Sequence, residues 1–120
     1  MSNDKIEKLK SLAKKVSRKT YGHDPRLERD IYHAIWGENR YNPQYTLDYK
    51  QAIRCFPFGA WVSELIQVSR EGWDGKGGWW KCVVVYDDAK STVVGYGTDI
   101  PRAVVSAGLL ARVELKNVEY

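Results

Sequence analysis

The hydrophobic pattern of this chain changes its period twice, and this limits the folds that are open to it. Before residue 57, apolar residues recur every three or four positions, which is typical of amphipathic helices. Residues 61–69, 79–86 and 92–96 are instead rich in Val, Ile, Trp and Tyr and are bounded by turn residues, which indicates strands. The helical period then returns near residue 99. The pattern therefore predicts helices, then a sheet, then a last helix.

Capping signals predict where the helices begin and end. Asp24 followed by Pro25 predicts the start of a second helix, which ends near Gly37. Thr46 is the expected cap of a short helix that runs to residue 55. Asp99 is the expected N-cap of the last helix.

The connections between the predicted strands are short enough for hairpins, so an antiparallel meander of three strands is expected. With helices before and after the sheet, the predicted class is α/β of the α+β type, a layered α-β-α sandwich with N-terminal helices and a C-terminal helix. The 120 residues are expected to form one domain, with a basic N-terminal helix over 1–22 and a sandwich body over 23–120. The apolar phase of each element predicts core positions at Leu27, Ile31, Ile53, Trp61, Val84, Val104 and Leu110.

The positive charge of the chain is concentrated at its N-terminus. Residues 1–26 hold eight Lys/Arg and three Asp/Glu, a balance of +5, whereas the whole chain carries +4. The first predicted helix has an apolar stripe and a lysine-rich opposite face. Such a face is either simply solvated or attracts nucleic acid or acidic protein surfaces. If it binds nucleic acid, the binding residues are expected to be Lys8, Lys15 and Lys19.

The sequence also bears on the cellular compartment. No apolar run reaches the ~18 to 20 residues that a membrane span needs. The start of the chain, MSNDKIEKLK, lacks the apolar segment of a secretory signal, so a cytoplasmic location is expected. Cys55 and Cys82 are too few for a disulfide scaffold and are expected to pack as free thiols.

The stretch EGWDGKGGWWKC, residues 71–82, holds three of the five tryptophans and four of the ten glycines. A lysine between glycines suggests a phosphate-binding loop, but that motif needs a following Ser or Thr and a helix, and a strand follows here. The glycines favour a looped hairpin instead. A tryptophan at the tip of this hairpin has no obvious core to enter, so the hairpin is expected to bind a partner through Arg70, Trp73, Lys76 and Trp79.

No arrangement of residues in the sequence predicts catalysis or metal binding. His23 and His33 lack Cys or carboxylate neighbours at the spacing of a zinc site. Cys82 falls in the middle of a predicted strand, where a packing thiol is expected rather than a nucleophile. The segment GYGTDIP lacks the third glycine of a dinucleotide-binding loop. We therefore expect no enzyme activity, no cofactor and no metal.

Four segments in this order, LERDIYHAIWG, YTLDYKQAI, WVSELIQV and GYGTDIPRAVVSAGLLA, resemble the phage ABA-sandwich family. Members are small domains encoded mainly by bacteriophages and prophages. The resemblance rests on residues 45–48, on Trp61 and on the Asp-x-Pro start of the last helix at Asp99, and it covers roughly residues 26–114. It implies a layered fold and a phage origin, and therefore the cytoplasm of a bacterial host cell as the location. The family has no agreed activity, so the resemblance implies no catalytic residues.

These observations favour an accessory protein that acts by binding. The expected function is inhibition of a bacterial host defence complex through protein–protein contacts, as an anti-CRISPR protein does. The alternatives are a nucleic-acid-binding module that uses the basic N-terminal helix, and a protein that sequesters a nucleotide signal. The expected partners are a host protein or ribonucleoprotein complex, with nucleic acid as the alternative and no membrane; the oligomeric state stays open.

Overall fold

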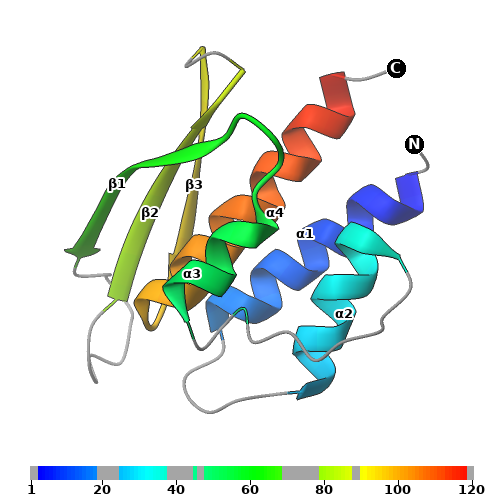
Figure 1. The fold of residues 1–120 in the computed structure, drawn as a ribbon, viewed down its shortest axis with the longest axis horizontal. Coiled ribbons are helices and arrows are strands. Elements are labelled where there is room, and N and C mark those ends of the chain that lie inside the picture. Colours follow the sequence, from blue (N-terminus) through cyan, green and yellow to red (C-terminus); the bar gives the residue numbers. More distant parts are fainter. Residues whose placement is uncertain are drawn as a thin grey trace.

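The computed structural model describes residues 3–18, 25–37, 45, 48–68, 79–87 and 90–118 of the chain. These residues form a mixed α+β fold with a three-stranded antiparallel sheet, which confirms the predicted α+β class with N-terminal helices, a meander and a C-terminal helix (Figure 1). The elements, in chain order, are α1 (Asn3–Arg18), α2 (Pro25–Trp36), α3 (Tyr49–Ala52), the 3-10 turn η1 (Ile53–Cys55), β1 (Trp61–Val68), β2 (Trp79–Tyr86), β3 (Ser91–Gly97) and α4 (Ile100–Val118).

The sheet is a meander in the order β1-β2-β3, and both strand pairs are antiparallel. Helix α4 packs directly on β2 and β3, and α1 packs on α4. Figure 1 shows the described helices on one side of the sheet, with α4 nearest the strands. The opposite face of the sheet therefore carries no helix among the residues that the structure describes.

The core lies between the sheet and the helices and follows the apolar stripes of the sequence. Helix α1 buries one stripe and leaves most of its lysines exposed, whereas α4 is buried on almost every side because it lies between the sheet and α1. The residues of the α1 stripe are Ile6, Leu9, Leu12, Ala13 and Val16. Of the predicted core positions, Leu27, Ile31, Val84 and Val104 are buried, and Leu110 is partly buried against the core.

Two predicted core positions are wrong. Trp61 is 48% exposed because a β-bulge between Val62 and Glu64 reverses the alternation of side chains at the start of β1. Ile53 is 38% exposed because the short helix continues as a 3-10 turn, in which side chains three positions apart lie on one face. Ala52 and Cys55 fill the buried positions instead.

The observed cap agrees with the sequence for α4, whereas the predicted cap of α3 is wrong. Asp99 accepts a hydrogen bond from the backbone N–H of Arg102 at 2.9 Å, which confirms it as the cap of α4. The cap of α3 is Asp48, which accepts from the backbone N–H of Lys50 at 2.8 Å. Thr46, the expected cap, lies outside the described residues.

Candidate functional site

The two faces of the sheet can be assigned from the strand register. Gly95 and Gly97 of β3 lie against the backbone of α4, and Gly95 pairs with Cys82 of β2, so these residues mark the inner face. Side chains alternate along a strand, so the positions between them point the other way. We name this opposite side the outer face; it consists of Trp61, Glu64, Ile66, Val68, Trp79, Lys81, Val83, Val85, Thr92, Val94 and Tyr96.

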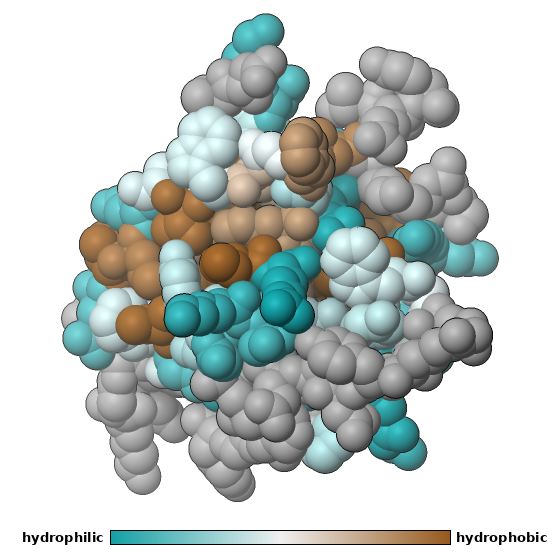
Figure 2. Space-filling view, viewed as in Figure 1, coloured by the Kyte–Doolittle hydropathy of each residue, from teal (hydrophilic) through white to brown (hydrophobic). Residues whose placement is uncertain are grey.

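The outer face is largely apolar and partly open to solvent. Trp61 is 48% exposed, Ile66 is 40% exposed and Tyr96 is 37% exposed. The valines between them are half-buried, and Glu64 is the acidic residue among them. In the view of Figure 2, hydrophobic side chains gather on the side of the molecule where the sheet lies. Contiguous exposed apolar side chains of this kind usually mark an interaction surface.

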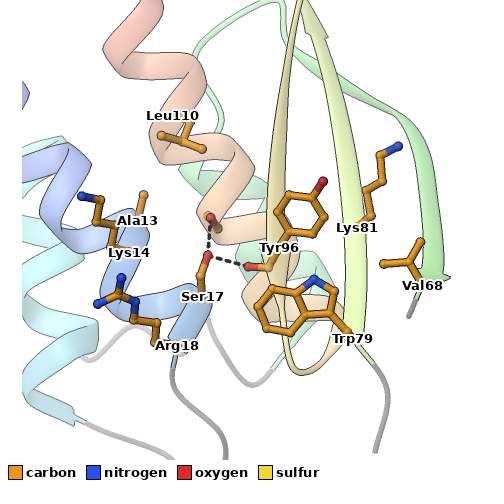
Figure 3. A pocket seen from close by; sticks show the side chains of 10 residues that line it. Ala13, Lys14, Ser17, Arg18, Val68, Trp79, Lys81, Tyr96 and Leu110 are labelled. Carbon is orange, nitrogen blue, oxygen red and sulfur yellow. Dashed lines mark hydrogen bonds between the residues drawn. The ribbon is translucent and has the colours of Figure 1, made fainter. Parts of the chain in front are cut away.

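A cleft of about 790 Å³ opens where the β3 edge of the sheet meets α1 (Figure 3). We name it the sheet-edge cleft. Helix α1 provides one wall, and the stacked rings of Trp79 and Tyr96 provide another. The described lining residues are Ala13, Lys14, Ser17, Arg18, Val68, Trp79, Lys81, Tyr96, Ser106 and Leu110.

A hydroxyl group fixes the geometry of the sheet-edge cleft. Ser17 of α1 donates a hydrogen bond to the carbonyl oxygen of Tyr96 at 2.7 Å, and its Oγ lies 2.9 Å from the Oγ of Ser106 on α4. One side chain therefore joins α1, β3 and α4. This fixes the end of α1 that carries Lys14 and Arg18 relative to the sheet.

The cleft combines positive charge with an aromatic wall. Lys14, Arg18 and Lys81 line it, and its described lining residues include no Asp or Glu. The rings of Trp79 and Tyr96 are stacked, with centroids 5.7 Å apart and planes inclined by 17°. Trp79 is only 3% exposed, so its buried ring packs against one side of the more exposed Tyr96 ring. The basic helix and the aromatic strands, which the sequence alone does not connect, meet at this cleft.

The predicted site residues fall into different parts of the molecule. Arg70, Trp73 and Lys76 lie outside the described residues, as does Lys19. Trp79 lies in the sheet-edge cleft. Lys8 and Lys15 are exposed on α1, but they do not share a cleft: Lys8 lies beside Arg26 and Arg29 of α2, whereas Lys15 faces the groove between α1 and α4.

Sequence reasoning did not single out Lys81, Tyr96 or the exposed Phe58. Lys81 and Tyr96 are neighbours only through the β2–β3 register, which periodicity does not supply. Phe58 is fully exposed at a turn in which Ala60 donates to the carbonyl of Pro57 at 3.2 Å and Gly59 has a φ of +84°. The Pro-Phe-Gly sequence was a usable signal in this case, because glycine at the third position of a turn favours a positive φ and leaves the second residue at the tip.

The two cysteines are buried, and burial raises the pKa of both thiols, that of Cys82 to about 12. We expect both thiols to resist a thiol-specific reagent at pH 8 in the folded protein and to react once it is unfolded in urea. Unfolded Cys82 ionises at its ordinary pKa of 9.0, so the unfolded state loses its proton first. Stability should therefore fall as the pH rises from about 9 to about 12. Rapid labelling of the folded protein at pH 8 would contradict the burial of the two thiols.

Two further findings concern the described part of the chain. Within it, no group of three or more His, Cys, Asp or Glu is placed to hold a metal ion. None of its helices is both long enough and apolar enough to cross a membrane.

Comparison with protein-family models, with curated proteins and with solved structures finds no match to this chain.

Proposed function

We propose that this chain acts by binding a protein partner on the outer face of its sheet and has no catalytic activity of its own. The single observation that carries the proposal is that Trp61 and Ile66 are exposed on a face that no described helix covers. Tryptophan is among the residues most enriched in binding hot spots, so Trp61 is the expected anchor.

The charges around the outer face indicate the chemistry of the partner. Lys81 lies on the face, and Lys14 and Arg18 stand beside its β3 edge. A partner that presents an apolar patch flanked by Asp and Glu would match the apolar centre and this basic edge.

The biological role that we propose is inhibition of a bacterial host defence complex by a protein encoded by a phage or prophage. It rests on the sequence resemblance and on the small size of the chain. Physical blocking of a host surface needs only binding, so the open outer face is sufficient for it. The same role implies action inside the host cytoplasm.

Site-specific photo-crosslinking in the host cell tests the proposal. A photoreactive residue replaces Ile66 on the outer face in one variant and Arg29, an exposed residue of α2, in a matched control. We expect a discrete protein adduct from position 66 and none of the same mass from position 29. Adducts of equal yield from both positions, or none from position 66, would contradict binding by the outer face.

Nucleic-acid binding by α1 is the second candidate function. The observation that favours it is that Lys8 of α1 shares a cleft with Arg26 and Arg29 of α2, so cations from two helices converge on one side of the molecule. Asp30 and His33 complete the described lining of that cleft. Phosphate contacts make affinity fall steeply with salt, so retention on a generic duplex at ~50 mM salt and its loss at higher salt would test this candidate.

A further inference from the structure

We infer that the sheet-edge cleft binds a nucleotide unit, with its base stacked on Tyr96 and its phosphate held by cations of α1 and β2. This ligand goes beyond the proposed protein-binding function, which is carried by Trp61 and Ile66 and shares with the cleft the cations Lys14, Arg18 and Lys81. The inference is carried by three features of the cleft: an aromatic platform, a set of cations that form no ion pair among the described residues, and a suitable volume.

Tyr96 provides the platform for the base. Trp79 stacks against its ring, so the orientation of the Tyr96 ring is set from one side. Tyr96 is nevertheless 37% exposed, which leaves part of it available for a second ring. Bases of any sequence stack on such side chains because every base has a flat π-face. Trp79 thus acts as a positioning residue, and Tyr96 is the residue that contacts the base.

The cations provide the phosphate contacts. Lys14 and Arg18 are four positions apart on α1 and so lie on the same side of the helix, along one wall of the cleft. Lys81 pairs with Tyr96 in the β2–β3 register, which places a third cation beside the platform. The ion pairs between described residues do not involve any of the three. Arginine and lysine are the usual partners of phosphate oxygens.

The volume and the apolar lining of the cleft fit the same ligand. Its volume of about 790 Å³ lies inside the ~300 to 1,000 Å³ that small-molecule sites commonly occupy. Ala13, Leu110 and Val68 supply apolar lining between the cations and the rings. A carboxylate side chain of a protein would use the cations and leave the aromatic platform unused, whereas a nucleotide uses both.

The test measures binding of fluorescently labelled probes to the full chain at ~50 mM salt. The probes are adenosine and guanosine triphosphates, and an oligothymidine of about 12 nucleotides. Binding of the free triphosphates would identify a small nucleotide as the ligand. Binding of the oligothymidine alone would identify a single strand, and either result supports the inference. Failure of the parent protein to bind any of these probes would overturn it.

Variants then locate the binding in the cleft. We expect Arg18→Glu and Tyr96→Leu each to weaken binding by about tenfold or more, because one removes a phosphate contact and the other the stacking platform. Lys90→Glu makes the same charge change at an exposed lysine of the turn between β2 and β3, outside the cleft, and should alter affinity by less than about twofold. Equal losses from Lys90→Glu and Arg18→Glu would overturn the inference, since the affinity would then depend on net charge and not on a position in the cleft.

The design separates this inference from the proposed function. Trp61→Ala should leave probe binding unchanged, because Trp61 does not line the cleft. If Tyr96→Leu fails to fold, as judged by its thermal transition, the exposed Arg18→Glu variant still decides the question. Loss of probe binding in Trp61→Ala, with its thermal transition intact, would place the site around Trp61 and contradict the assignment to the sheet-edge cleft.

Discussion

Replacing Gly95 with alanine is expected to lower the free energy of unfolding by about 3 kcal/mol or to prevent folding. A Cβ atom at this position would lie 2.2 Å from the backbone nitrogen of Ala107 and 2.6 Å from its Cα. Both atoms belong to the backbone of α4, so no side-chain rotation can relieve the overlap. Helix α4 would have to move away from the sheet on which it packs. Urea denaturation monitored by circular dichroism measures the loss.

Thr92→Ala is the matched control, because it also changes β3 but at an exposed position that pairs with Val85 on the outer face. Its effect should stay below about 1 kcal/mol. If Gly95→Ala were as stable as Thr92→Ala, β3 and α4 could not be as close as the structure places them.

The second large effect is expected at Arg112 of α4. Its Nε donates to the carbonyl oxygen of Cys55 at 2.6 Å, and its Nη2 donates to that of Phe56 at 2.9 Å. The guanidinium also lies 5.4 Å from the ring centroid of Trp36. One side chain thus joins α4 to η1 and to the end of α2. Arg112→Met leaves both carbonyl groups without this donor, and we expect a loss of about 2 to 4 kcal/mol.

Two further variants show whether this loss belongs to the hydrogen bonds of Arg112. Arg54→Met changes an exposed arginine of η1 and should cost less than about 0.5 kcal/mol. Arg112→Lys keeps the charge but not the planar fork that serves two carbonyl groups, so it should recover only part of the stability. Equal denaturation midpoints for Arg112→Met and Arg54→Met would show that these hydrogen bonds contribute little.

The elements of this fold were predictable from the sequence because their signals are local. The β2 strand was predicted over 79–86 and is observed as Trp79–Tyr86. Asp99 followed by an apolar helical stripe predicted the start of α4, and its side chain caps that helix. Periodicity and capping depend on residues within a few positions of one another, so they can be recognised without knowledge of the fold.

The errors have equally specific causes. Strict alternation from the core-facing Leu65 places Trp61 on the inner face, and only the bulge in β1 turns it outward. The sequence contains no strong signal for that bulge. The exposed anchor of the proposed interface was therefore assigned to the core.

The sheet-edge cleft could not be predicted for a different reason. Ser17 and the Tyr96 carbonyl that it contacts are 79 positions apart in the chain. Their meeting depends on how α1 packs on α4 and how α4 packs on the sheet, which are long-range contacts. The sequence suggested a basic helix and an aromatic hairpin as separate features, and only the packing brings Lys14 and Arg18 beside Tyr96.

The affinity of Trp61→Ala for the partner captured at position 66 tests the central claim most directly. Tyr49→Ala is the matched control, because Tyr49 is an aromatic residue of similar exposure, 42%, that lies on α3 and not on the sheet. We predict that Trp61→Ala weakens binding by about 2 kcal/mol, or roughly 30-fold, with its thermal midpoint nearly unchanged, while Tyr49→Ala binds like the parent. Unchanged affinity of Trp61→Ala, or an equal loss from Tyr49→Ala, would contradict the claim that the outer face of the sheet is the binding surface.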